Sequence, residues 1–238
     1  MKLIGFSTGA IAFGDFRKAL GLLAVLEVGA IELSALRVAE LSPLIAALDD
    51  LDLTRFEYIS FHAPSRFSPE EEPLVIKQLA AVAERGWPII LHPDSLHRPD
   101  AWRQLDEHLC FENMDKRKPI GRTADELSHF LRAFPKAGVC FDIGHAHQVD
   151  RTMTAARILA QRFGSRIRQI HVSEVNTASE HVCISAVTMI AFQKMIDLLD
   201  MDAPVIIESV VCQENLQREL RRVAVIFQEY SRTLLETD

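Results

Sequence analysis

The stretch GVCFDIGH at residues 138–145 contains the pattern that decides the fold of this chain. A short apolar run ends in a carboxylate, Asp142, and a more polar segment follows it. Near-continuous apolar runs of this length are typical of strands that are buried on both faces of a parallel sheet. The pattern occurs repeatedly, and the predicted strands are residues 3–8, 30–35, 58–63, 88–92, 109–113, 138–143, 167–173 and 204–210.

Longer segments with helical periodicity lie between the predicted strands. Apolar side chains recur at i, i+3 and i+4 in residues 74–85, and Thr123 is followed three positions later by Glu126, the spacing of a capping box. The helix near residues 100–108 is short. The clearest predicted helices are residues 74–85, 123–134, 186–199 and 214–235.

Strands that alternate with helices run parallel and are joined by right-handed crossovers. Units of this kind, spaced by roughly 30 residues, predict an α/β fold. We expect a single (β/α)8 TIM barrel over residues 1–238, a length near the usual size of that barrel. A doubly wound open sheet is the main alternative. It would favour a glycine-rich loop after the first strand, but the segment STGA at residues 7–10 follows that strand and no GxGxxG motif is present.

The composition is that of an ordinary globular protein, with 48% hydrophobic and 25% charged residues. No run approaches the roughly 20 apolar residues of a membrane span. The start, MKLIGFSTG, has no long apolar stretch, so we expect no signal peptide and a cytoplasmic protein. A net charge of −7 argues against nucleic acid as a partner, without excluding a nuclease with a local basic patch. The four cysteines form no CxxC pair and are expected to be reduced thiols.

The third to eighth predicted strands share one further feature. Each has a histidine, an aspartate or a glutamate at or near its carboxyl end. In a barrel these ends converge on one rim, where the active sites of this fold lie. Buried carboxylates and histidines would repel and desolvate one another unless a cation neutralised them. The sequence therefore predicts a divalent-metal site built from His62, His92, Glu112, Asp142, His171 and Glu208.

The order of the motifs at these strand ends, His, HP, EN, D-x-x-H, H-x-x-E and ES, resembles the xylose isomerase-like barrel superfamily. That superfamily holds sugar isomerases, ketose 3-epimerases, inositol-catabolism enzymes and abasic-site nucleases of the endonuclease IV type. The resemblance runs from the third strand to the eighth. It implies a second metal at His62 and His92, with Glu112 as the bridge, as in the nuclease branch. It also implies a core metal site at Glu112, Asp142, His171 and Glu208.

The nuclease branch has a third metal, held by the D-x-x-H histidine and by a later Asp-x-His pair. His145 matches the first histidine and His181 the last, but Ser179 stands at the position of the aspartate. Serine is a poor zinc ligand, so the resemblance implies a weakened or absent third site unless Glu174 or Glu180 compensates. This departure argues against a trinuclear phosphodiesterase mechanism.

Four further residues are predicted to bind substrate: Glu32, Lys116, His147 and Glu174. Glu32 ends the second strand and either points into the barrel mouth or pairs with a neighbouring cation. His147 is either a substrate contact or a decoration of the rim. Lys116 begins a basic run after the Glu112 strand, which on an acidic protein favours capture of a phosphate or carboxylate. The alternative is that these loops are simply charged, since acidic residues lie there too.

Two enzyme hypotheses follow. The first is a sugar or sugar-phosphate isomerase or epimerase, in which the resemblance implies that Glu112 and Glu208 move a proton next to a carbonyl while Asp142 and His171 are plain ligands. The rival is an endonuclease IV-like phosphodiesterase. A non-catalytic metal-binding barrel is a third class, against which the complete ligand set argues. We expect Zn²⁺ or Mn²⁺ as the metal, with Mg²⁺ or Co²⁺ as alternatives. The expected partner is a small molecule, with an anion as one alternative, and the sequence does not decide between a monomer and a homo-oligomer.

Overall fold

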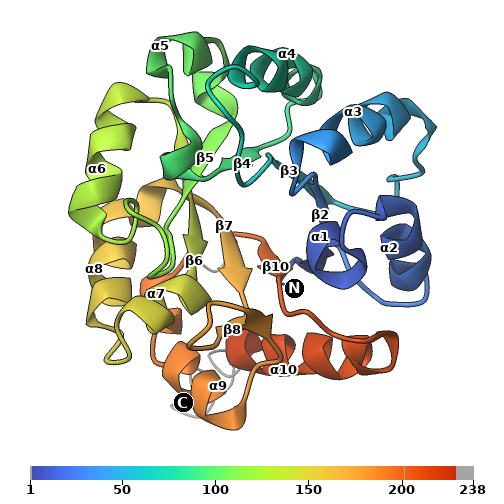
Figure 1. Cartoon of the computed structure of the whole chain (residues 1–238). Coiled ribbons are helices and arrows are strands. Elements are labelled where there is room, and N and C mark those ends of the chain that lie inside the picture. Colours follow the sequence, from blue (N-terminus) through green and yellow to red (C-terminus); the bar gives the residue numbers. More distant parts are fainter. Residues whose placement is uncertain (1, 201, 229–238) are drawn as a thin grey trace.

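The computed structural model describes residues 2–200 and 202–228. Eight parallel strands close into a barrel in the order β1-β10-β7-β6-β5-β4-β3-β2 (Figure 1). The chain therefore has the predicted (β/α)8 fold, and every predicted strand is present. The barrel strands are β1 (Ile4–Ser7), β2 (Ala30–Ser34), β3 (Tyr58–His62), β4 (Ile89–Leu91), β5 (Leu109–Glu112), β6 (Gly138–Asp142), β7 (Ile167–Val172) and β10 (Val205–Ile207). The expectation that residues 1–238 form one domain stays a prediction.

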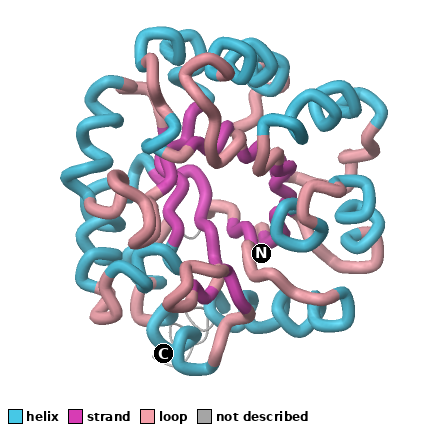
Figure 2. The backbone as a smooth tube through the Cα atoms, viewed as in Figure 1, coloured by secondary structure: helices cyan, strands magenta, loops and turns pink. Residues whose placement is uncertain are grey.

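Helices surround the barrel on its outer side (Figure 2). Among the described residues, no helix is both long enough and apolar enough to pass through a bilayer. The α-helices are α1 (Thr8–Ala12), α2 (Phe16–Leu23), α3 (Val38–Ala47), α4 (Glu72–Ala83), α5 (Pro99–Trp102), α6 (Ala124–Ala133), α7 (Ile143–Val149), α8 (Thr154–Phe163), α9 (Ala186–Gln193) and α10 (Leu216–Gln228). Short 3-10 turns are η1 (Leu48–Asp50), η2 (Pro93–Ser95), η3 (Arg103–His108), η4 (Gly164–Arg166), η5 (Ile196–Leu198) and η6 (Gln213–Asn215).

The helix predictions are confirmed in position but not always in extent. The Thr123 hydroxyl accepts a hydrogen bond from the Glu126 amide at 3.2 Å, and the Glu126 carboxylate accepts one from the Thr123 amide at 3.3 Å. The capping box therefore forms and begins α6. The helix predicted at 186–199 is shorter, because α9 ends at Gln193 and a 3-10 turn follows. Of the helix predicted at 214–235, residues 229–235 lie outside the described part of the chain.

Side chains that alternate along the barrel strands belong to two separate apolar clusters. Side chains such as Phe61, Phe111 and Phe141 belong to the large apolar core that includes the helices. Ile90, Cys110 and Cys140 are fully buried in a separate small cluster. Successive side chains on a strand point to opposite faces. Those three residues therefore lie on the opposite face of their strands, inside the barrel.

A two-stranded antiparallel sheet, β8 (Glu174–Val175) with β9 (His181–Val182), follows β7 and was not predicted. Ser179 lies in its turn with φ of 59°, in the left-handed region. The Val210 amide, just after β10, donates a hydrogen bond to the His181 carbonyl at 3.3 Å. This contact ties the hairpin, which carries His181, to the loop that follows Glu208.

Candidate metal centre

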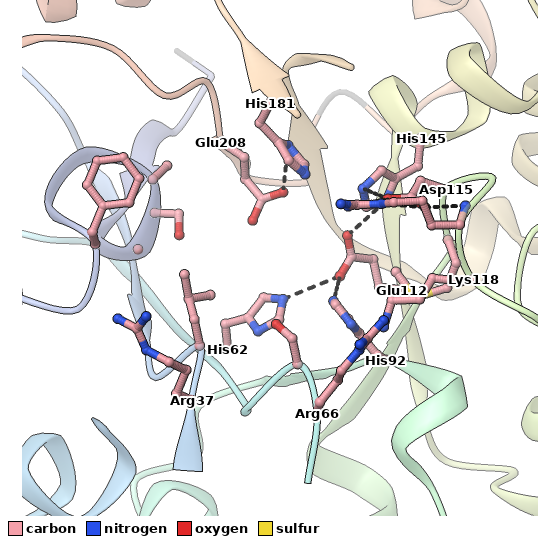
Figure 3. Close-up of a pocket in the computed structure, with 18 of the residues that line it drawn as sticks. Arg37, His62, Arg66, His92, Glu112, Asp115, Lys118, His145, His181 and Glu208 are labelled. Carbon is pink, nitrogen blue, oxygen red and sulfur yellow. Dashed lines mark hydrogen bonds and ion pairs between the residues drawn. The ribbon is translucent and has the colours of Figure 1, made fainter. Parts of the chain in front are cut away.

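The ligand-type side chains converge because of the two-residue period of the strands. His92, Glu112 and Asp142 each come two positions after Ile90, Cys110 and Cys140, which lie inside the barrel. They therefore point to the same side, one layer further toward the carboxyl ends of the strands. The same step leads from Ser60 to His62 and from Gln169 to His171. The predicted ligands thus lie close together at the barrel mouth, and Figure 3 shows four of them, His62, His92, Glu112 and Glu208.

Glu112 lies at the middle of the cluster and is almost completely buried. Its Oε2 lies 3.4 Å from His62 Nε2 and 3.1 Å from His92 Nε2. Its Oε1 lies 3.2 Å from His145 Nδ1 and 3.4 Å from His171 Nδ1. The two carboxylate oxygens therefore face two different sets of histidines. His62, His92 and Glu112 form the first group that could hold a metal ion.

A second group of four side chains comes from strands β5, β6, β7 and the end of β10. Asp142 and His171 are paired in register between neighbouring strands. His171 Nδ1 lies 3.3 Å from Glu208 Oε2, in addition to its contact with Glu112. Each of these residues offers one ligand atom, and the four atoms lie within 4.8 Å of one another: Glu112, Asp142, His171 and Glu208.

A third group joins Asp142 to two histidines, His145 and His181. His145 lies on the first turn of α7, where its amide donates to Asp142 Oδ1 at 2.6 Å and its Nδ1 lies 3.2 Å from Asp142 Oδ2. The His145 and His181 rings meet edge to face with centroids 5.1 Å apart. Ser179 does not belong to this group. Its hydroxyl accepts a hydrogen bond from Gln148 Nε2 at 2.6 Å.

The charges of the cluster depend strongly on one another. Burial raises the pKa of Asp142 to about 7. Burial alone would also raise the pKa of Glu112, but hydrogen bonds from the surrounding histidines hold it well below its ordinary value. Burial opposes protonation of His145, yet the neighbouring Asp142 and Glu112 raise its pKa to about 10. Burial lowers the pKa of His181 to about 4.

These residues fit a divalent metal. Asp142 Oδ2 is buried and accepts no hydrogen bond from any described residue, and the buried His92 Nδ1 is likewise without a hydrogen bond in residues 2–200 and 202–228. Asp142 Oδ2 lies 3.2 Å from His145 Nδ1, an ion-pair contact without a hydrogen bond. A buried carboxylate oxygen without a hydrogen bond is costly, and a cation would offset that cost. The candidate groups mix imidazole and carboxylate donors, which suits Zn²⁺ and Mn²⁺. Mg²⁺ prefers a set of oxygen ligands alone, and none of the three groups is such a set.

A network of hydrogen bonds below the cluster holds the candidate ligands in place. Glu32 is fully buried, and its Oε2 accepts a hydrogen bond from His171 Nε2 at 2.8 Å and one from Gln169 Nε2 at 2.7 Å. The Tyr58 hydroxyl donates to Gln169 Oε1 at 2.9 Å. A carboxylate on the far nitrogen of a ligand histidine fixes its tautomer and its orientation.

Asn113 makes a second fixing contact. Its side-chain amide donates to the Asp142 carbonyl at 2.7 Å, and its Oδ1 accepts from the Asp142 amide at 2.9 Å. The Asn113 carbonyl also lies 3.0 Å from His145 Nδ1. The asparagine of the EN motif therefore links the ends of β5 and β6, and a fixed spacing between Glu112 and Asp142 follows.

The cluster opens into a cavity of about 720 Å³. His62, His92, His145, His181, Glu112 and Glu208 line its floor, with cationic side chains such as Arg37, Arg66 and Lys118 around it (Figure 3). Asp115, which sequence reasoning missed, lines the same cavity with its Oδ2 4.0 Å from His145 Nε2. It follows Glu112 by three residues, but only the folded loop brings it to the site.

A family model described as a xylose isomerase-like TIM barrel matches residues 99–224, more than half of the 238 residues. The chain belongs to the xylose isomerase-like TIM barrel family. No curated protein sequence matches it.

Solved structures share the fold of this xylose isomerase-like barrel at low identity. Endonuclease IV from Thermus thermophilus is 18% identical with a TM-score of 0.65, over 95% of this chain and 99% of that one. The 3-keto-D-glucoside 4-epimerase from Escherichia coli is 13% identical with a TM-score of 0.61, over 95% and 99%. At these identities the likeness concerns the fold alone.

In this xylose isomerase-like barrel, the four residues predicted to bind substrate lie outside the described lining of the main cavity. Glu32 is in the network below the cluster, and Lys116 donates its amide to Gln148 Oε1 at 3.0 Å. His147 and Glu174 line a second hollow of about 460 Å³ beside α9. Glu174 accepts a hydrogen bond from the Ser185 amide at 2.8 Å. Neither it nor Glu180, which bonds Asn176, belongs to a ligand group.

Proposed function

We propose that this chain is a metal-dependent hydrolase of phosphoesters with more than one metal ion in its site. The observation that carries the proposal is the position of Glu112, whose two oxygens face separate sets of histidines at 3.1–3.4 Å. That arrangement suits a carboxylate shared between two ions. Pairs of closely spaced ions are typical of phosphatases and nucleases. The endonuclease IV likeness is in keeping with this choice.

His62 and His92 would hold one ion with Glu112, and Asp142, His171 and Glu208 would hold a second with the same carboxylate. When bound, such ions would supply Lewis acidity to a phosphoryl oxygen and activate water for attack. The chain itself contributes a nearly dry floor, since most of these ligands are buried. It also contributes rigidity, because Glu32 and Asn113 hold His171 and Asp142 in place.

Metal stoichiometry combined with one substitution tests the proposal. We expect wild type to bind at least two divalent ions and to cleave bis(p-nitrophenyl) phosphate. His92→Ala removes a ligand of the first group only, so it should lose about one ion and at least about 10²-fold in turnover. His129→Ala, on the surface of α6, is the matched control. A wild type with a single ion, or a His92→Ala variant with full activity at unchanged metal content, would contradict the proposal.

A sugar or sugar-phosphate isomerase or epimerase is the second candidate. The complete second group favours it, because Glu112 and Glu208 both face His171, and Glu208 lines the cavity. Two carboxylates around a bound carbonyl compound are suited to move a proton between carbons. The likeness to an epimerase agrees with this candidate.

Deuterium exchange separates the two candidates. The protein is incubated with divalent metal and a panel of ketoses and ketose phosphates in deuterated water. An isomerase would place deuterium next to the carbonyl, would lose about 10²–10⁴-fold in rate with Glu208→Gln, and would tolerate His92→Ala. A hydrolase would show no deuterium exchange, either in wild type or in the Glu208→Gln variant.

A further inference from the structure

The cationic side chains that line the main cavity differ in whether they are already neutralised. Arg117 pairs with Asp115 at 2.8 Å, Lys118 with Asp94 at 2.9 Å, and Arg37 with Glu40. Arg66 lines the same cavity and has neither an ion pair nor a hydrogen bond to any residue in the described ranges 2–200 and 202–228. It follows the ligand His62 by four positions. Arg66 therefore offers the cavity a guanidinium whose donors are free for a ligand.

An exposed aromatic side chain lines the same cavity. Phe13 is 65% exposed and is the first residue after α1. Its φ of 50° places it in the left-handed region, which a bulky side chain rarely adopts and which costs about 1 kcal/mol or more. Apolar side chains accompany it in the lining: Ala10, Leu36, Val38 and Val210. One part of the cavity is therefore an apolar wall with an unburied aromatic ring.

The size and charge of the cavity limit the ligand. Its volume of about 720 Å³ is within the range of small-molecule sites, roughly 300–1,000 Å³. A polyanion would need several cations free to neutralise its phosphates. Here three of the four cationic residues of the lining have carboxylate partners, and the whole chain carries a net charge of −7. A single small anion is therefore the better match.

We propose, on the basis of the hydrolase function proposed above, that the substrate is a small organic phosphoester with an apolar or aromatic group. Arg66 binds its phosphoryl group beside the ligand cluster, since a guanidinium donates two parallel hydrogen bonds to a phosphate. Phe13 packs against the apolar group, which buries the exposed ring. Arg66 and Phe13 thus determine which substrate binds, and neither belongs to the groups of candidate metal ligands.

Binding of two phosphonates tests this inference without catalysis. Phenylphosphonate and methylphosphonate carry the same anion and differ only in the ring, and calorimetry measures their affinity for the metal-loaded protein. Arg66→Ala should weaken both about tenfold, the loss of one charge-assisted interaction. Phe13→Ala should weaken phenylphosphonate at least about threefold and leave methylphosphonate unchanged. Arg98→Ala, another arginine in a loop after a strand, is the control and should change neither affinity.

The outcomes separate this inference from the proposed function. Phosphonate affinities that do not depend on Arg66, or a Phe13→Ala effect that is equal for both ligands, would overturn the inference even if phosphodiesters are cleaved. The expected affinity pattern without cleavage of any phosphoester would support the ligand class and overturn the hydrolase. Tight binding of duplex DNA with abasic sites at moderate salt, with a steep loss as salt rises, would overturn the small-ligand inference.

Discussion

Glu32 is the residue whose role depends most on the folded structure. Its position in the second predicted strand left two alternatives. In the structure it lies in the middle of β2, beneath the cluster and against His171. The pairing joins residues from β2 and β7, which are not neighbours in the barrel. Only the inward direction of both side chains brings them together, so no local pattern indicates this contact.

Glu32→Gln should weaken metal binding by about 10–100-fold, the usual effect of removing a carboxylate behind a ligand histidine. The shape of the side chain is kept, but the charge that orients His171 is lost. Competition with a chromogenic chelator measures the affinity, and Glu57→Gln, on the exposed turn before β3, is the control. An unchanged affinity in Glu32→Gln would contradict the positioning role.

Removal of the central ligands gives a second prediction. Asp142→Ala or His171→Ala should remove about one of the two bound ions while the barrel stays folded, because both belong to the four-residue group and neither belongs to the group of His62, His92 and Glu112. Elemental analysis gives the metal content, and circular dichroism reports the fold. Full metal retention in both variants would show that the ligands have been assigned to the wrong residues.

At the scale of elements, patterns within short stretches of sequence predicted the strands and the starts of helices. Apolar runs located all eight barrel strands, and the Thr123 and Glu126 spacing located the start of α6. The β8–β9 hairpin was missed because residues 174–182 are mostly polar and show no alternation. The lining residues Phe13 and Asp115 lie in loops, where the direction of a side chain depends on packing from other parts of the chain. The convergence of the candidate ligands was predictable because strand ends in a barrel have a fixed direction, and their role as ligands stays a prediction.

The capping box of α6 provides a prediction at this scale. Thr123→Ala removes the acceptor for the Glu126 amide and should lower the free energy of unfolding by about 1 kcal/mol. Thr123→Ser keeps a hydroxyl at the same place and should cost less. Urea unfolding of the metal-loaded proteins measures both. Equal stability of the alanine variant and wild type would mean that the cap contributes nothing to α6.

For the whole molecule, bound metal should contribute to stability, since the cluster joins strands from β3 to β10. A ligand at about 100 times its Kd stabilises the folded state by about 2.7 kcal/mol. For a chain of this size we expect a chelator to lower Tm by about 5–10 °C, and added Zn²⁺ to restore it. Asp142→Ala should show a smaller shift than wild type under both treatments, because it lacks one of the two ion sites. A wild type whose Tm is insensitive to chelation would contradict this.

The closure of the barrel has a consequence for how the chain folds. Ile4 pairs with Val205, so the last seam joins strands near opposite ends of the sequence. Contacts between such distant segments are slow to form, because a long stretch of chain must be ordered first. During synthesis, the seven earlier barrel strands therefore have two unpaired edge strands, β1 and β7, until β10 leaves the ribosome. An open sheet of that kind is prone to self-association. Pairing of β10 with β1 and β7 covers both edges and brings Glu208 to the other candidate ligands.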